Sequence, residues 1–210
     1  MRTLLIAGGG GHAGVVASVA QRTGVWRIVG YTDTADRGVI AGLCWLGPDE
    51  LALSLRQTGA AEAAALGVGH VGDPSKRIAL FERLRGFGFD LPPIVDPSAV
   101  VGPDTVLGAA TVIMPGAVVN IGTRVEFGCI INTHATIEHD CVIGAHSHIA
   151  PGATVCGGCH VGQSSMIGAG AVLAHGVRVP ARCVVGAGAT VVRDIQEPGV
   201  YVGTPARKLR

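Results

Sequence analysis

Sixteen aliphatic residues recur at intervals of six, from Val101 to Val191, without a gap. A second column lies two positions before each of them from Thr105 onward, and it holds only small or short side chains. A period of six fits neither the 3.6-residue turn of a helix nor the simple alternation of a strand. It is the period of a hexapeptide β-helix, in which each unit supplies one short strand and one corner. We therefore predict a solenoid over this half of the chain.

Three such units close one triangular coil of 18 residues, so residues that differ by 18 stack at a spacing of about 4.8 Å. The aliphatic column then fills the interior, and the small column lies where the wall bends. The repeat makes a little over five coils, which corresponds to a prism roughly 25 Å long. Glycine is frequent in this region because the corners require a positive φ.

Four cysteines, Cys129, Cys141, Cys159 and Cys183, fall in the column of small residues. Cys141 and Cys159 differ by 18, so they are expected to be stacked neighbours. We interpret these cysteines as small buried hydrophobic residues rather than as disulfide partners or metal ligands.

The first 93 residues have another pattern, in which short apolar runs alternate with glycine loops and helix-like stretches. This pattern predicts a Rossmann-like α/β domain over residues 1–93, a β-helix domain over 94–195 and a C-terminal tail over 196–210. The expected strands are Thr3–Ala7, Arg27–Tyr31 and Glu62–Val68, and the expected helices are Val15–Arg22 and Pro74–Gly86.

A glycine motif joins the first expected strand to the first expected helix. Gly9, Gly11 and Gly14 satisfy G-x-G-x-x-G, whose backbone N–H groups can hold a phosphate. Asp33 follows the second strand, where an acid can accept from a ribose or sugar hydroxyl. The alternative is a tight turn without a ligand. The domain is too small for a complete dinucleotide fold, so NAD is not expected.

Composition and charge narrow the class of protein further. The net charge is +1 and only 4% of residues are aromatic, which gives nucleic-acid binding little support. No stretch approaches 18 uninterrupted apolar residues, so no membrane partner is expected. The N-terminus turns directly into the glycine loop rather than into a signal peptide, and we therefore expect a cytoplasmic protein.

Polar residues that the repeat does not need gather in one short segment. His134, His139, Asp140, His146 and His148 lie within 15 residues. Imidazole accepts a proton near neutral pH, and a carboxylate can hold its tautomer. One histidine could therefore be the general base of an acyl transfer. The alternative for His139, as for His134 and His146, is a solvated corner position, and the role of His134 and His146 stays open.

Zinc binding is a second interpretation of the same histidines. Hexapeptide-repeat carbonic anhydrases bind zinc through three histidines from two adjacent subunits, and the spacing of His134 and His139 resembles two of those ligands. The third histidine would lie roughly two coils upstream, but the region around Ser98–Val101 contains none. No metal is therefore expected.

Several segments together resemble the NeuD/PglD family of sugar acetyltransferases. They are residues 132–144 (NTHATIEHDCVIG), residues 146–153, the N-terminal Gly-Gly-His and the tail at 199–206. The resemblance covers nearly the whole chain. It implies a homotrimer of left-handed β-helices with acetyl-CoA in the groove between neighbours. It also implies that a nucleotide-linked amino sugar docks with the N-terminal domain.

The resemblance also implies roles for individual residues. His139 corresponds to the base and Asp140 to its acidic helper, which is glutamate in the best-known relative. His148, Gly157, Ala169 and Ala187 correspond to residues along the acetyl-CoA path. For Gly157 the repeat gives a separate argument, because it follows His139 by 18 residues and should stack on it.

The sugar nucleotide is expected at the loops of the first domain. Its candidate residues are Gly10, Gly11, His12, Asp33, Gly69 and His70. Lys76 and Arg77 are candidates for the diphosphate, with a solvated helix face as the alternative. Arg207, Lys208 and Arg210 could meet the CoA phosphates, or they form a frayed basic tail.

The expected activity is N-acetylation of a UDP- or GDP-linked 4-amino sugar by acetyl-CoA, through direct attack with His139 as base. O-acetylation of sialic acid or another sugar hydroxyl is the nearest rival. A zinc lyase and a non-catalytic sugar-nucleotide sensor are the alternatives from other classes. The pattern leaves open the sugar, the nucleotide (UDP, GDP or CMP), the regiochemistry and the pathway.

Overall fold

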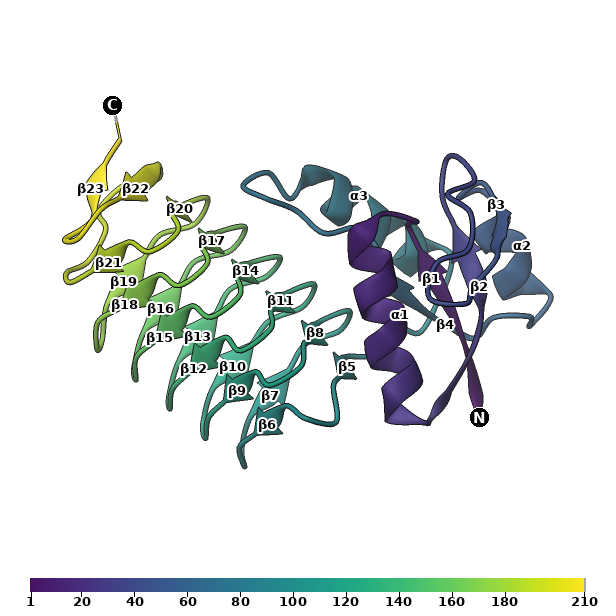
Figure 1. Ribbon diagram of the computed structural model, residues 1–210, viewed down its shortest axis with the longest axis horizontal. Coiled ribbons are helices and arrows are strands. Elements are labelled where there is room, and N and C mark those ends of the chain that lie inside the picture. Colours follow the sequence, from purple (N-terminus) through teal and green to yellow (C-terminus); the bar gives the residue numbers. More distant parts are fainter. Residues whose placement is uncertain (210) are drawn as a thin grey trace. The chain divides into compact units, whose positions relative to one another are not determined.

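The computed structural model describes residues 1–209, which divide into two compact units (Figure 1). The first unit comprises Met1–His70 and Ser75–Pro97. The second comprises Val71–Pro74 and the described chain from Ser98 onward. The first unit therefore runs four residues beyond the boundary expected at residue 93, and a four-residue loop of the N-terminal half groups with the solenoid.

The first unit is built on a four-stranded parallel sheet in the order β3-β2-β1-β4. Its strands are β1 (Arg2–Ala7), β2 (Trp26–Thr32), β3 (Trp45–Gly47) and β4 (Ala63–Leu66), followed by the short β5 (Ile94–Val95). Its helices are α1 (Gly11–Thr23), α2 (Leu51–Gln57) and α3 (Ser75–Gly86). The β1–α1–β2 crossover between parallel strands is the expected Rossmann-like unit.

Two elements of this unit have too weak a pattern for prediction. Strand β3 has only three residues, and α2 buries only Ala52. Helix α1 begins at Gly11, four residues before the expected start at Val15. Its N-cap is Gly10, whose backbone is extended. Glycine has no side chain that could accept a capping hydrogen bond, so the sequence does not indicate that the helix starts there.

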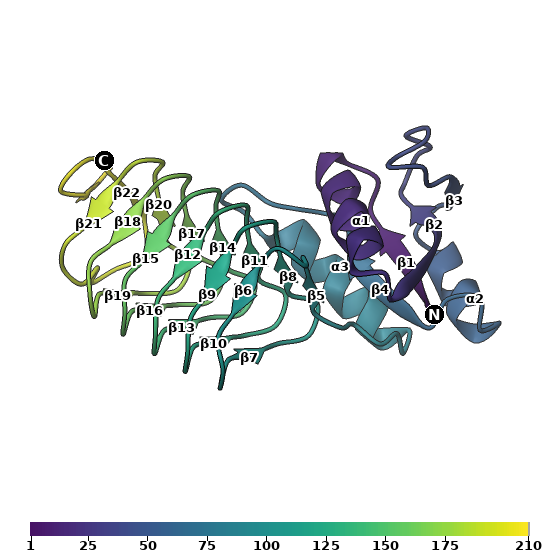
Figure 2. The same ribbon diagram turned by 60° about the horizontal axis from the view of Figure 1, so that its bottom comes forward.

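The second unit is a prism of two-residue parallel strands, and Figure 2 shows its coils stacked one after another. The three sheets run β6-β9-β12-β15-β18-β21, β7-β10-β13-β16-β19 and β8-β11-β14-β17-β20. Strands that neighbour each other in a sheet pair residues that differ by 18, as the period predicts. Strand β22 (Val200–Val202) adds to β20 in parallel, and β23 (Arg207–Lys208) pairs with β22 in the antiparallel sense.

The bounds of the solenoid strands follow the aliphatic column. They are β6 (Val100–Val101), β7 (Val106–Leu107), β8 (Val112–Ile113), β9 (Val118–Val119), β10 (Arg124–Val125), β11 (Ile130–Ile131), β12 (Thr136–Ile137), β13 (Val142–Ile143), β14 (His148–Ile149), β15 (Thr154–Val155), β16 (His160–Val161), β17 (Met166–Ile167), β18 (Val172–Leu173), β19 (Arg178–Val179), β20 (Val184–Val185) and β21 (Thr190–Val191).

The aliphatic column fills the interior from the second coil onward. From Ile113 to Val191 every member is at most 3% exposed. The first coil differs, because Val101 is 37% exposed and Leu107 is only half-buried. A coil at the end of a solenoid has a neighbouring coil on one side only, so its inward side chains are partly open.

The small column also ties successive coils together. Its hydroxyls and thiols donate to the carbonyl 15 residues further on, for example Thr123 to Glu138 at 2.9 Å and Ser147 to Gly162 at 3.0 Å. Cys159 likewise donates to Ala174 at 3.0 Å. The short side chains that carry a donor therefore link successive coils, a role that shortness alone did not reveal, whereas the alanines and Val177 of the column have no such donor.

The cysteines of this column are buried, as predicted, and all six cysteines of the chain are free thiols. Cys141 donates to the Cys156 carbonyl at 3.3 Å, and Cys159 lies one coil further on. Hydrogen bonding to Cys159 and burial together raise the pKa of Cys141. An un-ionised thiol of this kind acts as a structural side chain.

A third column appears only in the backbone angles. Every sixth residue from Asp104 to Gly188 has φ between +54° and +71°. Eight of these fifteen corner residues are glycine, so the expectation that the corners need glycine holds for about half of them. Within one coil the left-handed residues are His134, Asp140 and His146. A side chain in this conformation costs energy that glycine avoids, which marks the coil for a role beyond folding.

Candidate functional site

Two edges of the prism carry the residues expected around acetyl-CoA. We call the corners at 121–122, 139–140, 157–158 and 175–176 the His139 edge, and those at 115–116, 133–134, 151–152, 169–170 and 187–188 the Ala169 edge. The sheet that runs from β6 to β21 lies between these two edges. Each edge presents consecutive corner residues one coil apart.

His139 and Asp140 form a hydrogen-bonded pair on the His139 edge. Nδ1 of His139 lies 2.8 Å from Oδ2 of Asp140, and both side chains are accessible, at 50% and 73% exposure. A carboxylate only accepts, so Nδ1 carries the proton and Nε2 is left as the acceptor of a neutral ring. The pair therefore has the tautomer that a general base requires.

Gly157 lies beside the free nitrogen of His139. Its neighbour Gly158 donates its N–H to the His139 carbonyl at 2.9 Å, and a Cβ added to Gly157 would lie 2.5 Å from Nε2. The corner position of Gly157 is taken by Pro103, Pro115 and Pro151 elsewhere, so the fold does not need a donor there. The Gly157 N–H is thus available to a ligand next to a base.

Asp140 likewise packs against a glycine, Gly122, of the preceding coil. A Cβ added to Gly122 would lie 2.6 Å from Oδ1 of Asp140. The absence of a side chain at Gly122 therefore gives the carboxylate its place beside His139. Sequence reasoning missed this glycine, although it precedes Asp140 by 18 residues and could have been found from the period.

The cluster of histidines in the sequence does not stay together in space. His134 lies on the Ala169 edge, where its ring covers Gly116. His146 lies on the third edge, 6% exposed, with its ring edge-on to Phe127 at 5.1 Å between centroids. The three corners of one coil point in different directions, so neither ring joins His139 within this chain.

His148 lies on β14, in the sheet that contains β8, β11, β17 and β20, and is 7% exposed. Its Nε2 is 3.0 Å from Nδ2 of Asn132, and Oδ1 of that amide accepts the Thr133 N–H at 2.8 Å. Because the amide oxygen faces Thr133, the amide nitrogen donates to His148, and the proton of the ring lies on Nδ1. Sequence reasoning did not identify Asn132 as a neighbour of His148.

The residues expected along the acetyl-CoA path divide between the two edges. His139 and Gly157 lie on the His139 edge, whereas Ala169 and Ala187 lie on the Ala169 edge. A six-stranded sheet separates these edges within one chain. One chain therefore does not bring the whole expected set together.

The first unit contains a cavity of about 440 Å³ at the carboxyl ends of β1, β2 and β4. Its polar lining comes from Asp33, Arg37, Asp49, Lys76 and Arg83. Crevices at the carboxyl ends of parallel strands are the usual ligand sites of such sheets. Of the residues expected for the sugar nucleotide, Asp33 and the diphosphate candidate Lys76 line this cavity.

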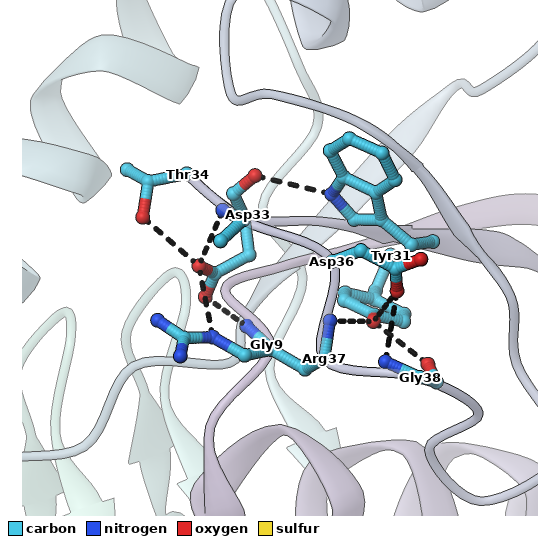
Figure 3. Close-up of polar contacts among 9 residues, drawn as sticks. Gly9, Tyr31, Asp33, Thr34, Asp36, Arg37 and Gly38 are labelled. Atoms are coloured by element: carbon cyan, nitrogen blue, oxygen red, sulfur yellow. Dashed lines mark hydrogen bonds and ion pairs between the residues drawn. The ribbon is translucent and has the colours of Figure 1, made fainter.

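Asp33 is already occupied by protein donors, as Figure 3 shows. Its carboxylate accepts the N–H groups of Gly9 at 2.7 Å and Ala35 at 3.2 Å and the Thr34 hydroxyl at 3.1 Å. Arg37 Nε lies 3.4 Å away. Burial alone would raise the pKa of Asp33, but these hydrogen bonds and the Arg37 charge hold it below the usual range. The expected acceptor for a ribose hydroxyl thus has little free capacity.

The other glycines and histidines expected to bind the sugar nucleotide lie around the start of α1. A Cβ on Gly10 or Gly11 would meet nothing within 4 Å, so these positions border open space. Gly69 packs against the ring of His12, 3.1 Å from where its Cβ would be. His70 is 9% exposed. The structure thus brings His12 and Gly69 together but buries His70.

The basic residues suggested as phosphate contacts differ in their exposure and in their partners. Lys76 lines the cavity, but Arg77 is 1% exposed and donates to the carbonyls of Leu66 and Val68 at 3.2 and 2.6 Å. Arg77 is therefore a structural residue that satisfies carbonyls at the end of β4, and its expected place at the diphosphate is wrong. Lys208 pairs with Glu197 at 2.8 Å, Arg207 is exposed, and Arg210 lies outside the described residues.

Comparison with known proteins gives consistent matches over both units. Residues 3–84 match the PglD N-terminal domain, residues 122–157 the bacterial transferase hexapeptide and residues 161–193 the hexapeptide repeat of succinyl-transferase. The acetyltransferase domain of PglB from Neisseria gonorrhoeae is 34% identical, with all of both chains covered and a TM-score of 0.91. Curated proteins give no match.

PerB from Caulobacter crescentus, solved with CoA and GDP-perosamine, is 33% identical over 100% of this chain and 98% of its own, with a TM-score of 0.92. The chain belongs to the PglD family of sugar acetyltransferases. WeeI from Acinetobacter baumannii covers the full length of both chains at 21% identity and a TM-score of 0.85, which shows a shared fold.

Membership in the PglD family confirms several expectations. The protein is an acetyltransferase with a left-handed β-helix behind a PglD-type N-terminal domain. Acetyl-CoA as the donor is confirmed at the level of the family, because the PglB domain was also solved with acetyl coenzyme A.

Within residues 1–209, no group of three or more histidines, cysteines or acids is arranged to hold a metal ion. In the same range, no helix is long and apolar enough to cross a membrane.

Proposed function

We propose that this PglD family member transfers the acetyl group of acetyl-CoA to the amine of a nucleotide-linked 4-amino sugar. The observation that carries the proposal is the His139–Asp140 pair, whose free Nε2 lies 2.5 Å from the position that a Cβ on Gly157 would occupy. A base and an oxyanion donor then lie side by side, and direct acyl transfer needs both.

The reaction follows from these positions. The thioester carbonyl oxygen accepts the Gly157 N–H, which places the carbonyl carbon beside Nε2 of His139. As the sugar amine attacks that carbon, Nε2 takes the amine proton and Asp140 stabilises the imidazolium that forms. Base catalysis of this kind contributes roughly 10²–10⁴-fold to the rate. The amine attacks the thioester directly, so no acyl-enzyme forms. The cysteines of the small column are buried and do not act as nucleophiles.

The division of the expected residues between two edges supports a homotrimer. In a closed ring of copies, the His139 edge of one chain faces a different surface of its neighbour, so the Ala169 edge of a second chain can complete the groove. His139 and Gly157 then act on the thioester, and Ala169, Ala187 and His148 of the neighbour line the acetyl-CoA path. A monomer is expected to be inactive.

The sugar nucleotide is assigned to the cavity of the first unit. Lys76, Arg37 and Arg83 offer three positive charges for a diphosphate, and the open backbone at Gly10 and Gly11 lies at a helix start. Asp33 holds Arg37 in place instead of binding a hydroxyl itself. GDP-linked 4-amino sugars are the first substrates to test, since PerB binds GDP-perosamine.

The test is a steady-state assay of CoA release with GDP- and UDP-linked 4-amino sugars, and with sialic acid as the contrast. We expect acetylation of an amine and a fall in kcat of at least about 100-fold in His139→Ala. Activity on sialic acid alone would replace the proposal with O-acetylation, for which the same base would serve. Near-normal turnover of His139→Ala would remove His139 from the mechanism.

A further inference from the structure

A second imidazole faces the reaction site from the other side. His175 lies on the His139 edge, two coils after His139, and the two ring centroids are 6.3 Å apart with a tilt of 45°. The coil between them contributes Gly157 and Gly158, which have no side chains. Nε2 of His139 lies over Gly157, and Cε1 of His175 lies 3.9 Å from where a Cβ of Gly158 would be. The two imidazoles therefore lie on either side of glycine backbone, and we call the space between them the notch.

The fold gives no reason for an imidazole at this corner. The equivalent positions in other corners hold proline, alanine, glutamine and phenylalanine, and His175 itself is exposed. A corner residue of any size can occupy this place. The histidine therefore contributes little to stability, and its position beside the notch is what distinguishes it.

We propose that His175 is the proton donor to the sulfur of CoA as the thioester breaks. This inference rests on the proposed function. With the carbonyl oxygen on the Gly157 N–H and the amine on the side of His139, the tetrahedral carbon carries two further substituents, the acetyl methyl group and the CoA sulfur. In this proposal the sulfur is the one that lies across the notch from His139, on the side of His175.

The proton and electron balance closes with these two residues. The amine lone pair forms the C–N bond, and the amine proton passes to Nε2 of His139. The electron pair of the C–S bond goes to sulfur, which takes the proton of a protonated His175 and leaves as the thiol. His139 releases its proton to solvent and His175 regains one, so the net reaction gives amide and CoA thiol without a further reactant.

The test compares His175→Ala and His175→Gln with the wild-type chain, using acetyl-CoA and the best sugar nucleotide. Glutamine keeps a hydrogen-bond donor of similar reach but cannot transfer a proton. We expect both variants to lower kcat by about 100-fold, the lower end of the contribution of a general acid, with little change in KM for acetyl-CoA. His160→Gln is the matched control, because His160 is also exposed but lies on strand β16 and not on a corner of the His139 edge.

Recovery of kcat in His175→Gln would overturn the proposal, since hydrogen bonding would then suffice. A normal kcat in His175→Ala, beside an inactive His139→Ala, would overturn the proton donor and leave the proposed function standing. Absence of acetyl transfer by the wild-type chain would overturn both. Unchanged thermal unfolding of the His175 variants verifies that only the site is altered.

Discussion

Oδ1 of Asp140 lies over Gly122, 2.6 Å from the position that a Cβ on that glycine would occupy. The carboxylate that orients the base is thus held by the absence of a side chain one coil earlier. His134 over Gly116 and His146 over Gly128 repeat this relationship at the other two corners of the same coil. In each of these three cases, the left-handed side chain packs over a glycine of the coil before it.

Gly122→Ala should displace Asp140 and lower kcat by about 10- to 100-fold, because Nδ1 of His139 loses its acceptor. Both Gly122 and Gly152 are left-handed, with φ of +70° and +65°, but a Cβ on Gly152 would meet nothing within 4 Å. Gly152→Ala is therefore the matched control for backbone strain, which costs roughly 1–2 kcal/mol in either variant. Equal kcat values for Gly122→Ala and Gly152→Ala would contradict the conclusion that Gly122 positions Asp140.

Gly157→Ala should abolish turnover while leaving the fold intact. Alanine already occupies the same corner position at Ala145, Ala169 and Ala187, so the backbone accepts a Cβ there. At Gly157 the added carbon would lie 2.5 Å from Nε2 of His139, which must then rotate away from the thioester. The measurement is kcat together with thermal unfolding. A fall in Tm with retained kcat would show that Gly157 serves packing only.

Asp140→Asn should lower kcat more than it changes KM for either substrate. An amide that donates to Nδ1 would place the ring proton on Nε2, which removes the acceptor that takes the amine proton. We expect a loss of about 100-fold or more. Asp140→Glu keeps the charge and should retain more activity than the asparagine variant. Equal kcat values for Asp140→Asn and Asp140→Glu would argue against the tautomer assigned to His139.

Asn132→Ala should raise KM for acetyl-CoA by about 5- to 10-fold, which corresponds to the loss of one hydrogen bond that orients His148. His148→Ala should have an equal or larger effect. The double variant should be no worse than His148→Ala, because Asn132 acts through His148. Additive losses in isothermal titration with acetyl-CoA would show that Asn132 has an independent role.

Asp33→Asn should destabilise the first unit at neutral pH by about 1–2 kcal/mol, since hydrogen bonds to a charged acceptor are lost. The pKa of Asp33 is lowered in the folded chain, so its contribution is complete above the ordinary aspartate value of about 3.9 and is lost as pH falls below it. Urea unfolding at pH 7 and near pH 3.5 measures this. The difference between variant and wild type should shrink at the lower pH, and a constant difference would contradict the assignment.

The repeat made most of the second unit predictable. The period of six places Val112, Ile130 and His148 on adjacent strands of one sheet, and it also places Gly157 next to His139. Such placement is possible because a solenoid contact joins residues at a fixed separation. In the first unit, β3 and α2 had no comparable signal, since a three-residue strand and a helix with one buried side chain carry little periodicity.

The repeat was enough to predict the coil, its interior, the buried cysteines and the pairing of His139 with its glycine, because all of these depend on separation along the chain. The distribution of the histidines among three edges could be seen only in the folded chain, since the direction of each corner depends on the closure of the whole coil. Tertiary structure also decided that Asp33 is occupied by Gly9 and Arg37, that Arg77 is buried, and that His175 faces His139. These relationships depend on side-chain orientation across distant segments, which no local pattern records.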